Sequence, residues 1–195
     1  MDNRRFLPVL VPSLLTLAMA ASWPAAAQLS DIIGGSNSTS TTPLSDGQIL
    51  EIIHTINDAE IKQAELAMDE SEDAQVMQVA QMIITDHESS NDQIEALEDA
   101  NDAIDLDDSD MSESIADMTE DAYEVLDDLD EAQFACAYLM KQEEQHQHGL
   151  DTVSKDLLPS TTSAEVTSFL AMTSTKMEQH LAMAKAARES LPGCG

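Results

Sequence analysis

Four segments of this chain can each be written as an amphipathic helix with a single apolar face. Apolar residues recur in them at alternating three- and four-residue steps, which places one stripe of side chains toward a shared core. The stripes begin near Ile49, Val76, Ala135 and Val166. Strand-like alternation of useful length is missing from the sequence, and aromatic residues make up only 3% of it. The sequence therefore predicts an all-α fold.

Each apolar stripe is interrupted by a residue that could bind a metal. A polar residue in register with such a stripe points into the core. Burying an unpaired polar group costs about 1 to 3 kcal/mol, and either mutual hydrogen bonding or a bound metal ion would relieve that cost. The sequence leaves both interpretations open. The candidate metal ligands are Glu60, His87, Glu143, His146 and His180.

The helical rise predicts how high each candidate lies along its helix. Counted from the connection between the first two helices, Glu60 and His87 lie at similar heights and should face each other. Pro159 is expected to end the third helix. Counted from the connection between the third and fourth helices, His146 and His180 differ in height by more than one turn. We therefore expect an elongated polar cluster and not one compact shell.

The residue types limit which ions the cluster can hold. Imidazole and carboxylate ligands suit iron, zinc or copper, so the possible cofactor is a divalent transition metal. Met177, His180 and Met183 form a local set that copper(I) could use instead. His54 and His148 lie off the inward faces and are expected at the surface. We identify no nucleophile with a neighbouring base and no phosphate-binding loop, so no catalytic residue is assigned.

The net charge of −30 is extreme for 195 residues. Lys and Arg total 8, against 38 Asp and Glu. Such a field repels nucleic acid and concentrates cations, so nucleic-acid binding is excluded and metal ions are the expected partners. The carboxylates occur in every segment, which is typical of a solvated acidic surface. A dedicated cation sponge is the alternative.

The first residues have the order of a secretory signal peptide. A basic pair, Arg4 and Arg5, precedes an apolar stretch from Phe6 to Ala21 and the small residues Ala25 to Ala27. The stretch is broken by prolines and too short for a membrane span, so the mature chain is expected to have no transmembrane segment. We expect cleavage after Ala27 and a periplasmic or secreted protein. Twin-arginine export is the alternative to general secretion.

Composition also divides the rest of the chain. The segment that follows the leader is rich in Ser, Thr, Gly and Asn, as flexible linkers are, and Ser45 or Asp46 can cap the first helix. A shorter acidic helix over 111–129 is expected to cross between the second and third main helices. The predicted organisation is a signal peptide at 1–27, a linker at 28–45, a helical domain at 46–191 and a C-terminal tail at 192–195.

The two cysteines are expected to form a disulfide. An antiparallel fourth helix would bring Cys194 back to the start of the third helix, where Cys136 lies. An exported protein reaches an oxidising compartment, in which such a bond persists. Two unpaired thiols are the alternative.

Several short runs resemble the bacterial domain-of-unknown-function 4142 family, a group of exported ferritin-like proteins. The runs are Asn57-Asp58-Ala59-Glu60-Ile61, then Val76 to His87, then Phe134 and Tyr138 ahead of His146, and finally His180-Leu181. The resemblance covers about 45–191. It implies a ferritin-like four-helix bundle, and it carries over Glu60, His87, His146 and His180 as site residues, with Asp86 as a supporting residue.

The chain departs from this family and from iron-oxidising ferritins at particular positions. Ala135 stands where an Asp commonly follows the Phe in the family. Iron-oxidising ferritins use a Glu-x-x-His pair on two helices. Here only Glu143 and His146 have that spacing, which puts a full di-iron site in doubt.

The family resemblance implies no established activity, because the family is named for lacking one. The expected role is non-catalytic divalent-metal binding or protection of the cell envelope from stress. One alternative is a di-metal oxidase or peroxide-consuming enzyme that uses Glu60, His87, Glu143 and His146. Another is a structural or interaction protein with a hydrogen-bonded polar core.

Overall fold

The computed structural model describes residues 43–194. This part of the chain is helical, with no strand, and the predicted all-α fold is confirmed. The predicted signal peptide, and the predicted linker up to residue 42, lie outside the described residues. None of the described helices is both long enough and apolar enough to cross a membrane. The elements are α2 (Asp46–Glu70), α3 (Ala74–Ala100), α4 (Asp110–Asp127), α5 (Glu131–Thr152), the π-helical turn η1 (Val153–Leu157) and α6 (Ala164–Ser190).

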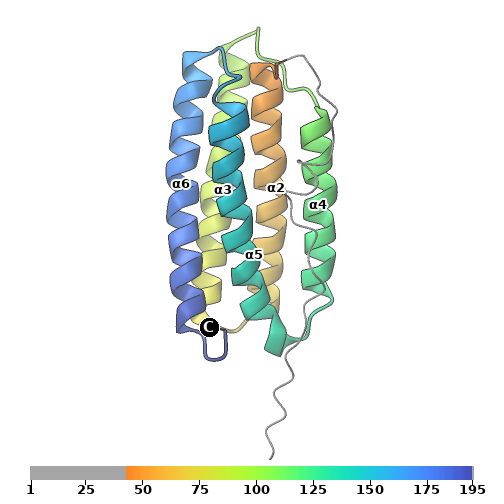
Figure 1. Ribbon diagram of the computed structural model, residues 1–195, viewed down its shortest axis with the longest axis vertical. Helices are drawn as coiled ribbons and strands as arrows, with labels where there is room; N and C mark the ends of the chain where they lie inside the picture. Colours follow the sequence, from red (N-terminus) through yellow and green to blue (C-terminus); the bar gives the residue numbers. More distant parts are fainter. Residues whose placement is uncertain (1–42, 195) are drawn as a thin grey trace, which may run out of the picture. The chain divides into compact units, whose positions relative to one another are not determined.

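The helices lie side by side along one long axis (Figure 1). Helix α2 packs against α3 and α5, and α6 packs against α3 and α5, so these elements surround a common interior. The acidic helix α4 packs mainly on α2. Ile115 and Leu126 are buried on its inner side, as an amphipathic helix on the outside of such an array requires. It occupies the chain position of the predicted crossover.

Side-chain caps determine where α2 and α3 begin. Ser45 accepts a hydrogen bond from the Gln48 N–H, and the Gln48 side chain accepts one from the Ser45 N–H, which together form a capping box. Asp73 caps α3 by accepting from the N–H groups of Gln75 and Val76. The helices are thus separated by the short break predicted at 71–73. This short connection keeps Glu60 and His87 at matching heights.

Buried polar residues occupy the middle of the array, between two apolar clusters. Along α2, Ile49 and Ile53 belong to one cluster and Ala64 and Ala67 to the other, with Glu60 between them. The same order holds along α3, α5 and α6, where the polar residues again separate the two clusters. The apolar clusters seal the polar layer from both ends of the array.

The connection from α5 to α6 begins where the sequence predicts. Helical structure ends with η1 at Leu157, and Leu158 is its cap, so the prediction that Pro159 ends this helix is confirmed. Turns follow, in which the N–H groups of Ser160 and Thr161 donate to the Leu157 carbonyl at 3.0 and 3.1 Å. Pro159 itself has no N–H to donate. The predicted height difference between His146 and His180 is wrong, because His146 Nε2 lies 2.9 Å from His180 Nδ1.

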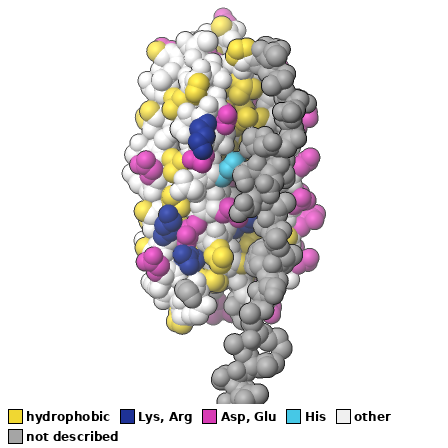
Figure 2. All heavy atoms as spheres, in the orientation of Figure 1, with side chains coloured by type: hydrophobic (Ala, Val, Ile, Leu, Met, Phe, Trp, Pro, Cys, Tyr) yellow, Lys and Arg dark blue, Asp and Glu magenta, His cyan; other side chains and the backbone are white. Residues whose placement is uncertain are grey.

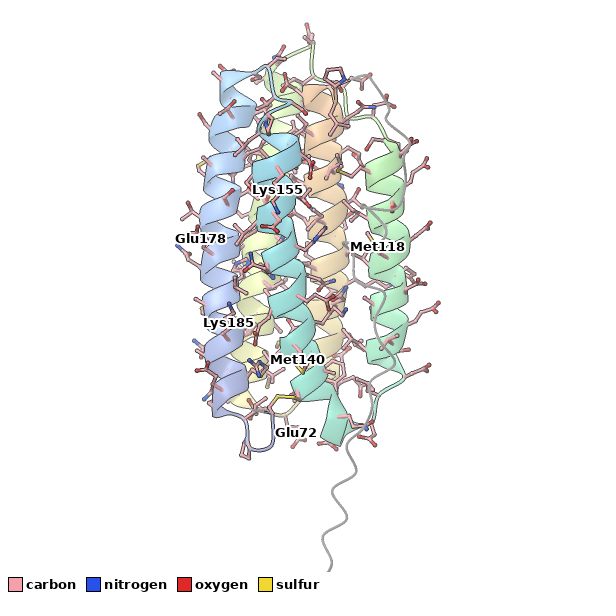
Figure 3. The ribbon with its side chains drawn as sticks, viewed as in Figure 1. Glu72, Met118, Met140, Lys155, Glu178 and Lys185 are labelled. Carbon is pink, nitrogen blue, oxygen red and sulfur yellow. A yellow bond between two sulfur atoms is a disulfide. The ribbon has the colours of Figure 1, made fainter. Side chains whose placement is uncertain are left out.

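A disulfide links the start of α5 to the chain end beyond α6. Cys136 and Cys194 have an S–S distance of 1.96 Å and are separated by 58 positions, and the bond is visible in Figure 3. The Arg188 guanidinium donates to the Cys194 carbonyl at 3.2 Å. The bond therefore closes the α5–α6 hairpin, as the sequence predicts.

Acidic side chains are scattered over the face shown in Figure 2, with few basic side chains among them. Within residues 43–194, lysine and arginine side chains form ion pairs with Asp86, Glu120, Glu143, Glu144 and Asp151, so most of the acidic groups there have no such partner. The surface therefore attracts cations from every side without selecting one position for them.

Candidate metal centre

The structure brings together four of the five predicted ligands. Each comes from a different helix: Glu60 from α2, His87 from α3, His146 from α5 and His180 from α6. Their exposed fractions are 3%, 5%, 1% and 1%, so the group is removed from solvent. We call these four residues the inner cluster. One ring nitrogen from each histidine lies within 4.8 Å of the corresponding nitrogens of the other two.

The distances within the inner cluster are short. Glu60 Oε2 lies 3.1 Å from His87 Nε2 and 3.2 Å from His146 Nε2. His146 Nε2 in turn lies 2.9 Å from His180 Nδ1. Although His87 Nε2 and Glu60 Oε2 are this close, neither atom has a hydrogen-bond partner of acceptable geometry. The predicted elongated cluster is therefore wrong, and the four side chains form one compact set.

The outward-facing nitrogens of His146 and His180 both face acceptors. His146 Nδ1 lies 2.9 Å from the carbonyl oxygen of Gln142, which can only accept, so this nitrogen carries a hydrogen and donates it. His180 Nε2 lies 3.0 Å from Oδ2 of Asp86 and donates in the same way. In neutral rings, the inner nitrogens are then His146 Nε2 and His180 Nδ1, each with a free lone pair.

A chain of amides sets the orientation of the third histidine. Asn91 Nδ2 donates to the Asp58 carboxylate at 2.8 Å, which leaves Asn91 Oδ1 to accept from Asn57 Nδ2 at 2.7 Å. Asn57 Oδ1 is then an acceptor, and His87 Nδ1 donates to it at 2.7 Å. The inner nitrogen of His87 is therefore also unprotonated in the neutral ring.

Four electron-pair donors thus converge in the inner cluster: three imidazole nitrogens and one carboxylate oxygen. No hydrogen lies between them when the rings are neutral, so the donors repel one another unless a cation or added protons hold them together. Neighbouring ligands on a tetrahedral zinc ion with bonds of about 2.0 to 2.1 Å lie about 3.3 Å apart. The three short distances in the cluster, 2.9 to 3.2 Å, are close to that separation.

The electrostatics of the inner cluster favour a charged carboxylate at Glu60 and neutral rings at His146 and His180. Burial raises the pKa of Glu60, but attraction to His146 and His87 outweighs burial and lowers this pKa to about 2. Burial lowers the pKa of His146. Burial also lowers the pKa of His180, to about 4, although its hydrogen bond to Asp86 acts in the opposite direction. Metal binding requires these same protonation states.

Glu143 is not part of the inner cluster. Although it has the Glu-x-x-His spacing with His146, its carboxylate forms an ion pair with Arg188 on α6. Asp86, predicted as a supporting residue, does lie beside the cluster and contacts His180 directly. His54 and His148 lie elsewhere, His54 beside Asp58 and His148 beside Thr152.

Sequence reasoning assigned no role to several polar residues around the inner cluster. Asn57 and Gln63 are 1% and 0% exposed and stand three positions before and after Glu60 on α2. Helical neighbours at this spacing share a face. A polar residue one turn before and one turn after Glu60 was therefore the sequence signal that could have identified both. Gln142 is also fully buried, on α5, but the contact of its backbone carbonyl with His146 could not be read from the sequence.

A layer of unpaired polar atoms lies next to the inner cluster. Both side-chain atoms of Gln63 and of Gln142 are buried without a hydrogen-bond partner among the described residues, and so is the Tyr138 hydroxyl. Helices α2 and α5 run in opposite directions, so these two glutamines lie on the same side of Glu60 and His146 (Figure 1). Burial and the charge of Glu60 both raise the pKa of Tyr138, which keeps its hydroxyl protonated.

We predict that Tyr138→Phe leaves the stability unchanged or raises it by up to about 1 kcal/mol. The substitution removes a buried hydroxyl that has no partner and keeps the ring, which stacks on Phe134. Urea unfolding followed by circular dichroism measures the difference. A loss of more than about 1 kcal/mol would show that the hydroxyl has a partner in solution.

Acid should destabilise the metal-free protein through His180. Its pKa is about 4 in the folded chain and about 6.5 in a model peptide, so the unfolded chain binds a proton between these values and the folded chain does not. The contribution of His180 to stability is complete above pH 6.5 and is lost as the pH falls toward 4. We expect it to lower the free energy of unfolding by about 2 to 3 kcal/mol between pH 7.5 and 4.5.

The measurement compares wild type with His180→Gln, both free of metal, by urea unfolding at the two pH values. The comparison is needed because protonation of the acidic surface relieves repulsion and acts in the opposite direction. The difference in stability between the two proteins should shrink or reverse at pH 4.5. An identical pH dependence in both would contradict the assignment.

Comparison with known proteins places the chain in a family. No curated protein and no solved structure matches it. A family model described as Domain of unknown function (DUF4142) matches residues 34–187, which include all four residues of the inner cluster and Asp86. This range covers most of the chain and agrees with the resemblance seen in the short runs. The chain therefore belongs to the DUF4142 family.

Proposed function

We propose that this protein binds one divalent transition-metal ion through Glu60, His87, His146 and His180. The observation that carries the proposal is the state of the outward-facing ring nitrogens. All three donate to acceptors of the protein, so the inner nitrogens are free to bind an ion together with the carboxylate. Such outer partners usually orient histidine ligands and increase their basicity.

The ligand set supports a holding role and not catalysis. Four protein ligands complete a tetrahedral shell, whereas catalytic zinc sites keep one position open for water or substrate. Three imidazoles and a carboxylate suit zinc, iron or copper. The di-metal alternative has less support, because Glu143 pairs with Arg188 and Glu60 is the only carboxylate that the described residues contribute to the inner cluster.

A purely hydrogen-bonded core is the competing explanation. To pair every inner atom, the cluster would need one proton between Glu60 and His87 and another between His146 and His180. With Glu60 ionised, His87 and either His146 or His180 would then be imidazolium ions, with ring centroids 5.2 to 6.0 Å apart and nearly removed from solvent. Burial opposes a charge on His146. A bound metal ion satisfies the same atoms without any imidazolium.

We place this role in a ferritin-like bundle that is exported from the cytoplasm. The helix arrangement around a polar middle layer, with ligands from facing helices, supports the bundle. The basic, apolar and small-residue order of the leader supports export, and so does a disulfide, which persists in an oxidising compartment. Holding a redox-active or toxic ion there would protect the envelope from stress.

Calorimetric titration of the metal-free protein with zinc tests the proposal. Wild type should bind one tightly held ion per chain, and His87→Ala should lose this binding because a ligand is removed. His54→Ala is the matched control, since His54 also lies near Asp58 but outside the inner cluster. It should bind like wild type. Equal affinity in wild type and His87→Ala would contradict the proposal.

A further inference from the structure

A cleft of about 340 Å³ lies between α3 and α6, beside the inner cluster. His87 and His180 form part of its wall, and Asp86 and Lys176 also line it. Apolar clusters close the polar layer toward both ends of the array. The cleft is therefore a direct approach to the inner cluster from solvent.

The exposed fraction of three side chains at the cleft decreases from the solvent side toward the core. The side chain of Lys176 is 52% exposed, that of Asp86 is 20% exposed and that of His180 is 1% exposed. Asp86 uses both carboxylate oxygens: Oδ1 accepts from Lys176 Nζ at 2.8 Å and Oδ2 accepts from His180 Nε2 at 3.0 Å. A single carboxylate thus connects an exposed ammonium group to a buried ring.

The wall of the cleft combines the apolar side chains of Phe169, Met172 and Met177 with polar residues that suit a hydrated cation. Ser89, Ser90 and Thr173 also line the cleft, and Ser90 Oγ is buried without a partner among the described residues. Six water molecules of about 30 Å³ each occupy about 180 Å³, which is less than the volume of the cleft. Among the described residues that line the cleft, Lys176 is the only lysine or arginine, and Asp86 neutralises it.

We propose that this cleft is the transit site through which a hydrated divalent cation reaches and leaves the inner cluster, with the Asp86–Lys176 ion pair as its gate. The proposal rests on the proposed metal binding. The incoming ion displaces the Lys176 ammonium from Asp86, loses water to the carboxylate and then moves to the inner nitrogens. Release follows the same steps in reverse. No bond other than coordination bonds is made or broken.

The test measures both zinc uptake and zinc release in Lys176→Met by stopped flow, with a fluorescent zinc chelator as the competitor. Lys185→Met is the matched control, because Lys185 is exposed on the same helix (Figure 3), does not line the cleft and gives the same change of net charge. Removing the gate should accelerate uptake and release alike, by about fivefold each, and leave Kd nearly unchanged.

Comparison of the zinc uptake rate with the zinc release rate distinguishes a gate from a purely electrostatic effect of Lys176. If Lys176 acted only as a positive charge near the bound ion, its loss would accelerate uptake but slow release. Slower or unchanged release in Lys176→Met would therefore overturn the proposal, and so would equal rates in Lys176→Met and Lys185→Met. If zinc does not bind the inner cluster of wild type at all, the proposed function fails, and the transit site fails with it.

Discussion

Zinc at about 100 times its Kd should raise the midpoint of thermal unfolding of the metal-free protein by about 5 to 11 °C. A ligand that binds only the folded state at this excess adds about 2.7 kcal/mol, and 1 kcal/mol shifts the midpoint of a domain of this size by about 2 to 4 °C. The shift should disappear on addition of a chelator. Differential scanning calorimetry with and without zinc measures it.

His146→Ala should abolish this zinc-dependent shift. His146 contacts both Glu60 and His180 within the inner cluster, and loss of even an outer supporting partner costs metal sites about 10- to 100-fold in affinity. The matched control is His148→Ala, two positions away on α5, whose ring lies beside Thr152. A full zinc shift in His146→Ala, or its loss in His148→Ala, would contradict the assignment.

Loss of the disulfide should destabilise the protein by about 4 kcal/mol. The bond closes a loop of 58 positions, for which the chain-entropy relation gives about this value. The double variant Cys136→Ser/Cys194→Ser should therefore unfold about 8 to 16 °C below oxidised wild type. Scanning calorimetry in the presence of a chelator keeps any metal contribution out of the comparison.

Reductant provides the internal control for the disulfide prediction. It should lower the unfolding midpoint of wild type to that of the double variant and leave the double variant unchanged. A change of less than about 1 kcal/mol would indicate that the contacts of α5 with α6, including the Arg188 hydrogen bond to the Cys194 carbonyl, already hold the chain end in place without the bond.

The sequence was most informative where one helix passes into the next by a short, capped break. Asp73 ends the break and starts α3, so residue counts on either side predicted that Glu60 and His87 face each other, and their atoms lie 3.1 Å apart. The apolar stripes also predicted which face of each helix is buried. Periodicity and rise are local properties, and they transfer directly from sequence to structure.

The sequence failed where the outcome depended on contacts between helices. The turns between Leu157 and Ala164 follow no periodic pattern, so the relative height of His146 and His180 could not be predicted from residue counts. Glu143 has a ligand-like spacing, but a salt bridge to Arg188 on the neighbouring helix determines its direction. The amide chain that orients His87 crosses between α2 and α3 and was equally invisible.

The acidic surface makes the location of a bound ion the decisive question. Carboxylates scattered over the exterior hold cations loosely through oxygen, whereas the inner cluster offers three nitrogens and one oxygen. Stoichiometry and thermal shifts report that an ion binds, but the identity of its ligands separates the two locations. A measurement of the coordinating atoms therefore tests the account directly.

Zinc K-edge X-ray absorption of wild type loaded with one equivalent of zinc provides this measurement. The account predicts a four-coordinate ion with bonds of about 2.0 to 2.1 Å and the outer-shell scattering of three imidazole rings. In His180→Ala, which lacks one ligand, the imidazole scattering should disappear because the inner cluster no longer holds the ion. A spectrum with oxygen ligands alone, unchanged in His180→Ala, would place the zinc on surface carboxylates and contradict the existence of the metal centre.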